Sequence, residues 1–115
     1  VMISFALKPD GTLRSGHNAE SVFAELEQAG AAALGINCIA ADDMLPPLVK
    51  RLKRTLSIPL ICKPNTGKAV DGIRTVDIHM FTAVMRRCIE NGAALVGGCC
   101  GTTPEYIAAL KNIIQ

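Results

Sequence analysis

The stretch ALVGGCCGTTPE, residues 94–105, joins an apolar run, two adjacent cysteines between glycines, and a Thr-Pro pair. An apolar run that stops at a glycine turn is typical of a buried strand. Thr103 as N-cap and Pro104 at the first helical position then predict the start of a helix. The stretch therefore predicts a strand, a turn and a helix in succession.

The same pattern occurs three times earlier in the chain. Four apolar runs are each followed by a helical pattern: 1–7, 32–38, 58–62 and 93–99. The predicted helices begin at Asn18, at Asp42 or Asp43, at Asp77 and at Pro104. Strands that alternate with helices in this way predict an α/β fold of parallel βα units, with strands that are apolar on both faces.

One long irregular stretch interrupts this pattern, KPNTGKAVDGIRTV at residues 63–76. A loop of this length between a strand and its helix is often an active-site lid. A surface excursion without function is the alternative.

The composition excludes several classes of protein. The 115 residues are 50% hydrophobic, with a formal net charge of +2, three Phe, one Tyr and no Trp. The one dense basic run, 50–54, lies beside apolar residues at helical spacing, which predicts a solvated helix face and no nucleic-acid partner. The longest weakly polar stretch, 29–41, is shorter than the roughly 20 residues that span a bilayer, so we expect no membrane contact either.

The five cysteines do not form the pattern of a secreted disulfide protein, because their number is odd and two are adjacent. We therefore predict free thiols in a reducing cytoplasm. In parallel α/β folds the chemistry gathers at the carboxyl ends of the strands. Cys38, Cys62 and the Cys99–Cys100 pair all lie at predicted strand ends.

Cys38, Cys99 and Cys100 form a three-sulfur set that can hold a tetrahedral Zn²⁺ with its fourth position open. Both adjacent cysteines reach one site only if the backbone leaves strand geometry, which the flanking Gly98 and Gly101 permit. Three thiolates make Zn²⁺ a poor Lewis acid, but a thiol substrate bound at the open position would lose its proton and become a nucleophile.

Two other interpretations of the cysteines remain open. Free cysteine is common as a small buried hydrophobic residue, and we predict this role for Cys62 and Cys88. A closed structural site with Cys62, His17 or His79 as a further ligand is the second alternative. Each histidine also fits a solvated position on a helix flank or in a loop.

These residues resemble the zinc-dependent homocysteine S-methyltransferase family, which includes the homocysteine-binding domain of cobalamin-dependent methionine synthase. The motifs that carry the resemblance are GINC at 35–38, KPNTG at 63–67 and GGCCGTTPEYI at 97–107. The family commonly has Tyr-Pro-Asn-Ala-Gly at the second motif. By this resemblance Cys38, Cys99 and Cys100 bind zinc, the sulfur of homocysteine takes the fourth position, and Asn65 lies beside the metal.

The resemblance also implies a fold. The family forms a (β/α)₈ TIM barrel, which typically needs about 250 residues. Residues 1–115 then correspond to the C-terminal half of one homocysteine-binding domain, strands five to eight of the barrel. The family's first-strand motif, Asp-Gly-x-x-Gly-Thr, is absent. We therefore expect a partner that completes the barrel, either the N-terminal half or a second half-barrel copy.

The activity implied is a zinc-dependent transfer of a methyl group to homocysteine, giving methionine. We expect Asn37 and Phe5, the latter in SFALKPDG at 4–11, to help bind substrate. The motifs are closest to the cobalamin-dependent branch, in which methylcobalamin and methyltetrahydrofolate on other modules supply the methyl group. A betaine or S-methylmethionine type donor is one alternative, and a non-catalytic fragment with a structural zinc or a metal-free cysteine core is another.

Overall fold

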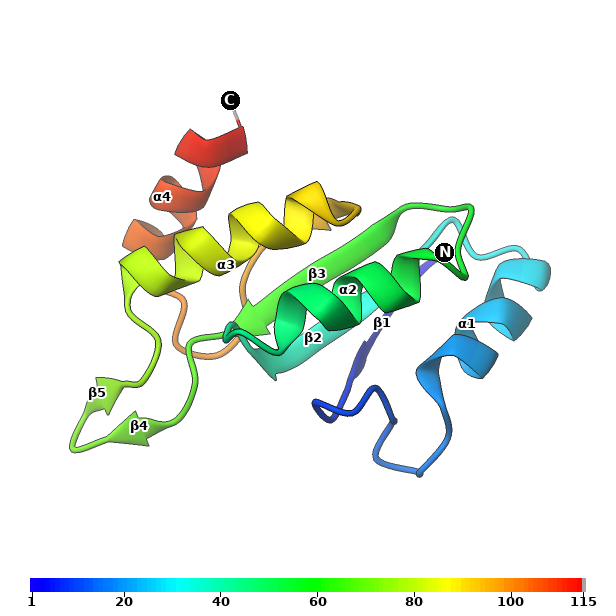
Figure 1. The fold of residues 1–115 in the computed structure, drawn as a ribbon, viewed down its shortest axis with the longest axis horizontal. Helices are drawn as coiled ribbons and strands as arrows, with labels where there is room; N and C mark the ends of the chain where they lie inside the picture. Colours follow the sequence, from blue (N-terminus) through cyan, green and yellow to red (C-terminus); the bar gives the residue numbers. More distant parts are fainter. Residues whose placement is uncertain (115) are drawn as a thin grey trace.

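The computed structural model describes residues 1–114 and contains the four predicted βα units (Figure 1). The main sheet is parallel, with the strand order β1-β2-β3-β6. Its strands are β1 (Met2–Ala6), β2 (Ala33–Ala40), β3 (Leu60–Asn65) and β6 (Ala93–Val96). The helices are α1 (Ala19–Gln28), α2 (Leu45–Lys53), α3 (Ile78–Glu90) and α4 (Pro104–Ile114). The predicted mixed α/β fold with parallel strands is confirmed.

Local sequence signals set most of the helix boundaries. Asn18 caps α1 by accepting a hydrogen bond from the N–H two residues on at 2.8 Å, and Asp77 caps α3 by accepting one from the N–H three residues on at 2.8 Å. Gly30 follows α1 with φ +100°, as expected of a glycine after a helix end. Helix α2 begins at Leu45, two or three residues later than predicted, because Asp42 caps a turn by accepting a hydrogen bond from the N–H of Met44.

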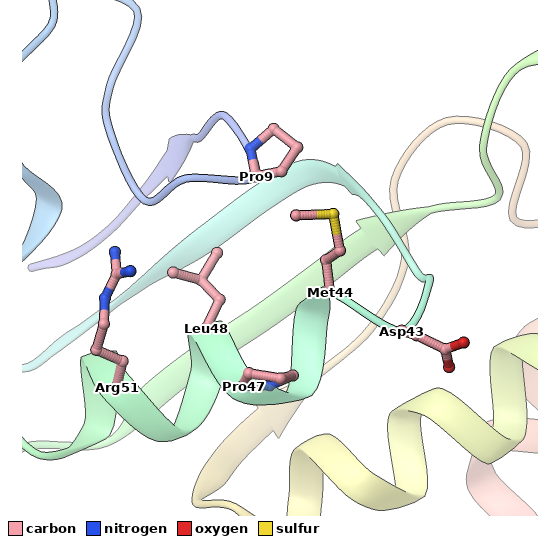
Figure 2. Close-up of a pocket in the computed structure, with 6 residues that line it drawn as sticks. All are labelled: Pro9, Asp43, Met44, Pro47, Leu48 and Arg51. Atoms are coloured by element: carbon pink, nitrogen blue, oxygen red, sulfur yellow. The ribbon is translucent and has the colours of Figure 1, made fainter.

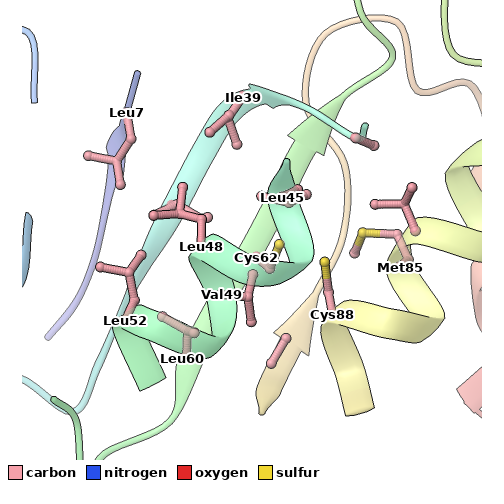
Figure 3. Close-up of a cluster of buried hydrophobic side chains, with 14 of the residues drawn as sticks. Leu7, Ile39, Leu45, Leu48, Val49, Leu52, Leu60, Cys62, Met85 and Cys88 are labelled. Carbon is pink, nitrogen blue, oxygen red and sulfur yellow. The ribbon is translucent and has the colours of Figure 1, made fainter. Parts of the chain in front are cut away.

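The hydrophobic core lies between the helices and one face of the sheet (Figure 3). Strand alternation directs Leu34 and Ile36 on β2, and Leu60 and Cys62 on β3, toward the helices, and all four are fully buried. The helices contribute fully buried side chains to the same core: Phe23, Leu45, Val49, Leu52, Phe81 and Met85.

Cys62 and Cys88 belong to this core, as predicted (Figure 3). Both are free and buried. Hydrogen bonding to Cys88, together with burial, raises the pKa of the Cys62 thiol well above its ordinary value. A thiol held in this way stays neutral and serves as a packing residue.

The opposite face of the sheet is polar toward the carboxyl ends of the strands. Asn37 and Lys63 are register partners on β2 and β3, and both are partly exposed. Lys63 takes part in neither of the two ion pairs formed by residues 1–114. This face therefore offers uncommitted polar groups beside the strand ends.

Residues 63–76 differ from the predicted irregular loop. Strand β3 continues to Asn65, and β4 (Ala69–Val70) and β5 (Ile73–Arg74) then form an antiparallel hairpin (Figure 1). Asp71 and Gly72 at its turn have φ 51° and 77°. Positive φ at both positions is the type I′ geometry that matches strand twist, and an Asp-Gly pair is its usual sequence.

Two predictions about the surface can be compared with the fold. The basic run lies on the outer side of α2, where Lys50, Arg51 and Arg54 are exposed, so it is the predicted solvated helix face. Within residues 1–114, every helix is too short or too polar to cross a membrane.

Candidate metal centre

Three cysteine sulfurs gather at the carboxyl end of the sheet. The Sγ atoms of Cys38, Cys99 and Cys100 all lie within 4.8 Å of one another. Cys38 and Cys99 are partly buried, whereas Cys100 is exposed. Neither Cys62 nor a histidine belongs to this group, and His17 and His79 are both exposed. In the part of the chain that the structure describes, the alternative of a closed four-ligand site is therefore not found.

Cys38 reaches the cluster through an irregularity in β2. We predicted that this strand ends at Cys38, but it continues to Ala40, with a register shift against β3 between Asn37 and Ala40. Cys38 has φ 56°, in the left-handed region that residues other than glycine rarely adopt. Ile36 and Ile39 both point into the core although they are three positions apart. The bulge thus removes Cys38 from the regular alternation.

Cys99 and Cys100 lie in the glycine-rich loop that follows β6. The N–H of Gly97 donates to the carbonyl of Cys62 at 3.1 Å, and the N–H of Cys99 donates to the carbonyl of Pro64 at 2.9 Å. These bonds keep the loop beside β3 after regular strand geometry has ended at Val96. The predicted departure from strand geometry at the two cysteines is confirmed.

The Sγ atoms of Cys38 and Cys99 lie in direct contact, whereas Cys100 is free. That all five thiols are free stays a prediction for this pair. Their Cα atoms are 5.6 Å apart, within the range that a disulfide spans, because the bulge in β2 and the loop after β6 converge. Thiolates are the metal-binding form of cysteine, so metal binding here requires the reduced pair.

In the reduced form this donor set fits Zn²⁺. Zn–S bonds measure about 2.3 Å, so two sulfurs on one tetrahedral ion are separated by about 3.8 Å. A spread of no more than 4.8 Å among the three sulfurs is compatible with one shared ion. Three protein ligands leave a fourth position, which is the arrangement of catalytic zinc sites.

The other predicted site residues, Asn37, Asn65 and Phe5, have different surroundings in the fold. Asn37 immediately precedes Cys38 on the polar face of the sheet. Asn65 ends β3, and its Oδ1 accepts a hydrogen bond from the N–H of Gly67 at 2.9 Å. Phe5 is not brought to the cluster, because its ring packs on Phe23 of α1, with the ring centroids 6.2 Å apart.

Two cavities open near the carboxyl ends of the strands. One, of about 350 Å³, is lined by Ala40, Asp42, Asn65, Gly67, Lys68 and Thr75. The other, of about 380 Å³, lies at the start of α2 and is lined by Pro9, Asp43, Met44, Pro47, Leu48 and Arg51 (Figure 2). The guanidinium of Arg51 already donates to Glu20 at 2.7 Å and to the carbonyl of Asp10 at 3.0 Å. Only the first cavity contains a predicted site residue, Asn65.

Two residues without a predicted role, Thr66 and Arg74, contact the cysteine loop. Both donate hydrogen bonds to the carbonyl of Cys100. A signal was present, since Asp71-Gly72 between apolar residues predicts a hairpin. That hairpin carries Arg74 on its second strand.

The fold and the cluster define a class of protein: an α/β protein with three cysteines gathered at the carboxyl edge of a parallel sheet. The homocysteine S-methyltransferase family model matches residues 1–114. The chain belongs to this family.

Similar proteins include enzymes of known structure. The homocysteine methyltransferase MmuM from Escherichia coli, solved in a metallated form, is 33% identical with a TM-score of 0.77, over 96% of this chain and 34% of that one. Homocysteine S-methyltransferase YbgG from Bacillus subtilis is 37% identical over 91% of this chain and 35% of its own length. Methionine synthase from Mycobacterium leprae is 29% identical over 93% of this chain and 9% of its own length. The chain thus spans well under half the length of these relatives.

Proposed function

We propose that this chain is part of an enzyme that transfers a methyl group to the sulfur of homocysteine, giving methionine, with Zn²⁺ bound by Cys38, Cys99 and Cys100. One observation carries the proposal: cysteines from two distant motifs converge within 4.8 Å in a chain of the homocysteine S-methyltransferase family. That the similar enzyme MmuM was solved in a metallated form supports metal binding by this chain. A reducing cytoplasm would keep the cluster able to bind metal.

We also propose that residues 1–115 form the C-terminal half of a (β/α)₈ barrel, strands five to eight. Four consecutive parallel βα units support this arrangement, as does the similarity to about a third of the MmuM chain. The polar face with Asn37 and Lys63 would then line the barrel interior. Either the N-terminal half or a second half-barrel copy would cover it and complete the homocysteine pocket.

In the proposed reaction the residues of this chain hold the metal and orient the substrate. When bound, Zn²⁺ supplies a positive centre that lowers the pKa of a thiol ligand, so the protein needs no general base. The thiol proton of homocysteine would leave to solvent, and the thiolate sulfur would then bond to the methyl carbon. The bond between the methyl group and its donor would break in the same step, and the demethylated donor would leave with the electron pair of that bond. Since Oδ1 of Asn65 is engaged by Gly67, its Nδ2 hydrogens remain available to the substrate.

The methyl donor that we propose is methylcobalamin, supplied from methyltetrahydrofolate on other modules. Similarity to methionine synthase from Mycobacterium leprae over 93% of this chain supports an enzyme of the methionine synthase type. A betaine or S-methylmethionine type donor would benefit from aromatic groups around its cationic centre. The one tyrosine, Tyr106, is already engaged, because its ring packs on Phe81 and its hydroxyl donates to the carbonyl of Val76 at 2.9 Å.

A cobalt titration of the reduced chain tests this proposal. Co²⁺ replaces Zn²⁺ in tetrahedral thiolate sites and provides thiolate-to-metal and ligand-field absorption. We expect one Co²⁺ per chain, with a tetrahedral spectrum that shifts when homocysteine is added.

Two results would contradict the proposal. No tetrahedral signal would show that this chain does not assemble the metal site. A signal that ignores homocysteine, both here and in the chain extended by four more βα units, would favour a structural metal in a non-catalytic fragment. Methionine serves as the control ligand, because its thioether has no proton to lose.

A further inference from the structure

We propose that Arg74 and Thr66 are positioning residues for the metal centre: they hold the carbonyl of Cys100 and thereby fix how Cys99 and Cys100 present their sulfurs. This inference rests on the proposed metal-binding function of the three cysteines. We call Thr66, Arg74 and the Cys100 carbonyl the carbonyl clamp.

The Cys100 carbonyl is the point at which these contacts meet. It accepts hydrogen bonds from the N–H of Thr66 at 3.1 Å, from the Thr66 hydroxyl at 3.4 Å and from Nη2 of Arg74 at 3.4 Å. Nε of Arg74 also donates to the Thr66 hydroxyl oxygen at 2.9 Å. Each partner therefore contacts the other two, which restricts the carbonyl to one orientation.

Burial and packing leave little freedom around the clamp. Thr66 is fully buried and is the one buried polar residue in the described part of the chain. Gly101, which follows the held carbonyl, has φ +79°. A Cβ at this position would collide with the Thr66 hydroxyl and the Arg74 guanidinium. The cysteine loop thus lies directly against the clamp, with no space for a side chain between them.

The hairpin supplies Arg74 from a fixed position. The N–H of Val76 donates to the carbonyl of Thr66 at 2.9 Å, and the N–H of Thr75 donates to the carbonyl of Lys68 at 3.0 Å. These bonds close the base of the hairpin, and the type I′ turn at its tip sets the pairing of β4 with β5. The segment between β3 and α3 therefore places a guanidinium against the cysteine loop.

The charge of Arg74 favours the same role. Three thiolates exceed the charge of Zn²⁺ by one, so the loaded centre is anionic. Arg74 takes part in neither of the two ion pairs formed by residues 1–114. Its guanidinium makes two directed hydrogen bonds here, which a lysine cannot reproduce.

The test compares Co²⁺ affinity and the ligand-field spectrum among reduced variants of the chain. Arg74→Gln removes the charge and the fork of donors, Arg74→Lys retains only the charge, and Thr66→Val removes the hydroxyl at nearly constant volume. Arg86→Gln is the matched control, because Arg86 is exposed and belongs to neither ion pair. Affinity comes from competition with a chelator, and circular dichroism of the metal-free chain checks the fold.

We expect Arg74→Gln to weaken Co²⁺ binding by about 10- to 100-fold and to change the spectrum, as is typical when a partner of a metal ligand is lost. Arg74→Lys should recover part of the affinity, and Arg86→Gln should equal the wild type. Wild-type affinity and spectrum in folded Arg74→Gln would overturn the inference. If that variant does not fold, unchanged binding by both Arg74→Lys and Thr66→Val overturns it. Failure of the wild-type chain to bind Co²⁺ would instead overturn the proposed function.

Discussion

The five cysteines divide into two groups with different backbone environments. Cys62 and Cys88 lie within a regular strand and a regular helix and point into the core. Cys38 lies at a bulge with φ 56°, and Cys99 and Cys100 lie in a glycine-rich loop. Regular geometry buries a thiol among apolar side chains, whereas irregular geometry at the strand ends turns three thiols toward one point. The backbone, more than the residue type, decides which cysteines can perform chemistry.

The largest effect expected from this comparison is on metal binding. Cys99→Ser replaces one thiol of the three-cysteine cluster with a hydroxyl, which is a weak zinc ligand. This variant should not bind Co²⁺ stoichiometrically. Cys62→Ala in the core should leave binding unchanged, because Cys62 lies outside the cluster. A cobalt titration of both reduced variants measures the difference. Full Co²⁺ binding by Cys99→Ser would show that Cys38, Cys99 and Cys100 do not form the metal site.

A smaller effect is expected on stability. Cys62→Ser places a hydroxyl in the apolar core beside Cys88 and should lower the free energy of unfolding by about 1–3 kcal/mol. Cys100→Ser changes an exposed side chain and should alter it by less than about 0.5 kcal/mol in the metal-free chain. Urea denaturation of the two variants without metal measures this contrast. If both variants lost the same free energy of unfolding, the surroundings of Cys62 and Cys100 would differ less than the burial of the two side chains indicates.

The smallest effect is a pH dependence specific to the core. The pKa of Cys62 is raised in the folded chain, so the unfolded chain loses this proton first as pH increases. The stabilising contribution is complete below the ordinary thiol pKa of 9.0 and declines above it. The free energy of unfolding should fall by about 1 kcal/mol between about pH 8 and pH 10 because of this thiol. Urea denaturation of Cys62→Ala over the same range is the control, and an identical decline there would assign the effect to other groups.

Local signals were sufficient for most of the fold. The caps at Asn18 and Asp77 and the apolar periodicities depend on neighbours in the sequence, so they predict helices and strands without tertiary information. The hairpin also had a local signal, Asp71-Gly72, although its segment was interpreted as irregular. For the site, parallel strands place their carboxyl ends at one edge, which predicted that thiols gather there. The choice of Cys38, Cys99 and Cys100 over Cys62 came from the glycines beside the adjacent pair and from the family resemblance.

Other features of the site depend on tertiary contacts and had no local signal. The left-handed conformation of Cys38 arises where β2 shifts its register against β3. The contact between Arg74 and the Cys100 carbonyl joins residues 26 positions apart. The contact between the sulfurs of Cys38 and Cys99 likewise requires two chain segments to converge.

Cys38 and Cys99 lie far apart in the sequence, and this separation affects how a shared metal ion would act on folding. Cys38 and Cys99 are 61 residues apart. Cys38 lies within β2 and Cys99 follows β6, and these two strands lie on either side of β3 in the sheet. A metal ion shared by them would cross-link two strands that do not pair with each other. Because an ion that binds only this arrangement stabilises it by mass action, each tenfold rise in free metal above the dissociation constant would add about 1.4 kcal/mol. The supply of metal in a cell would then shift the balance between the folded and the unfolded chain.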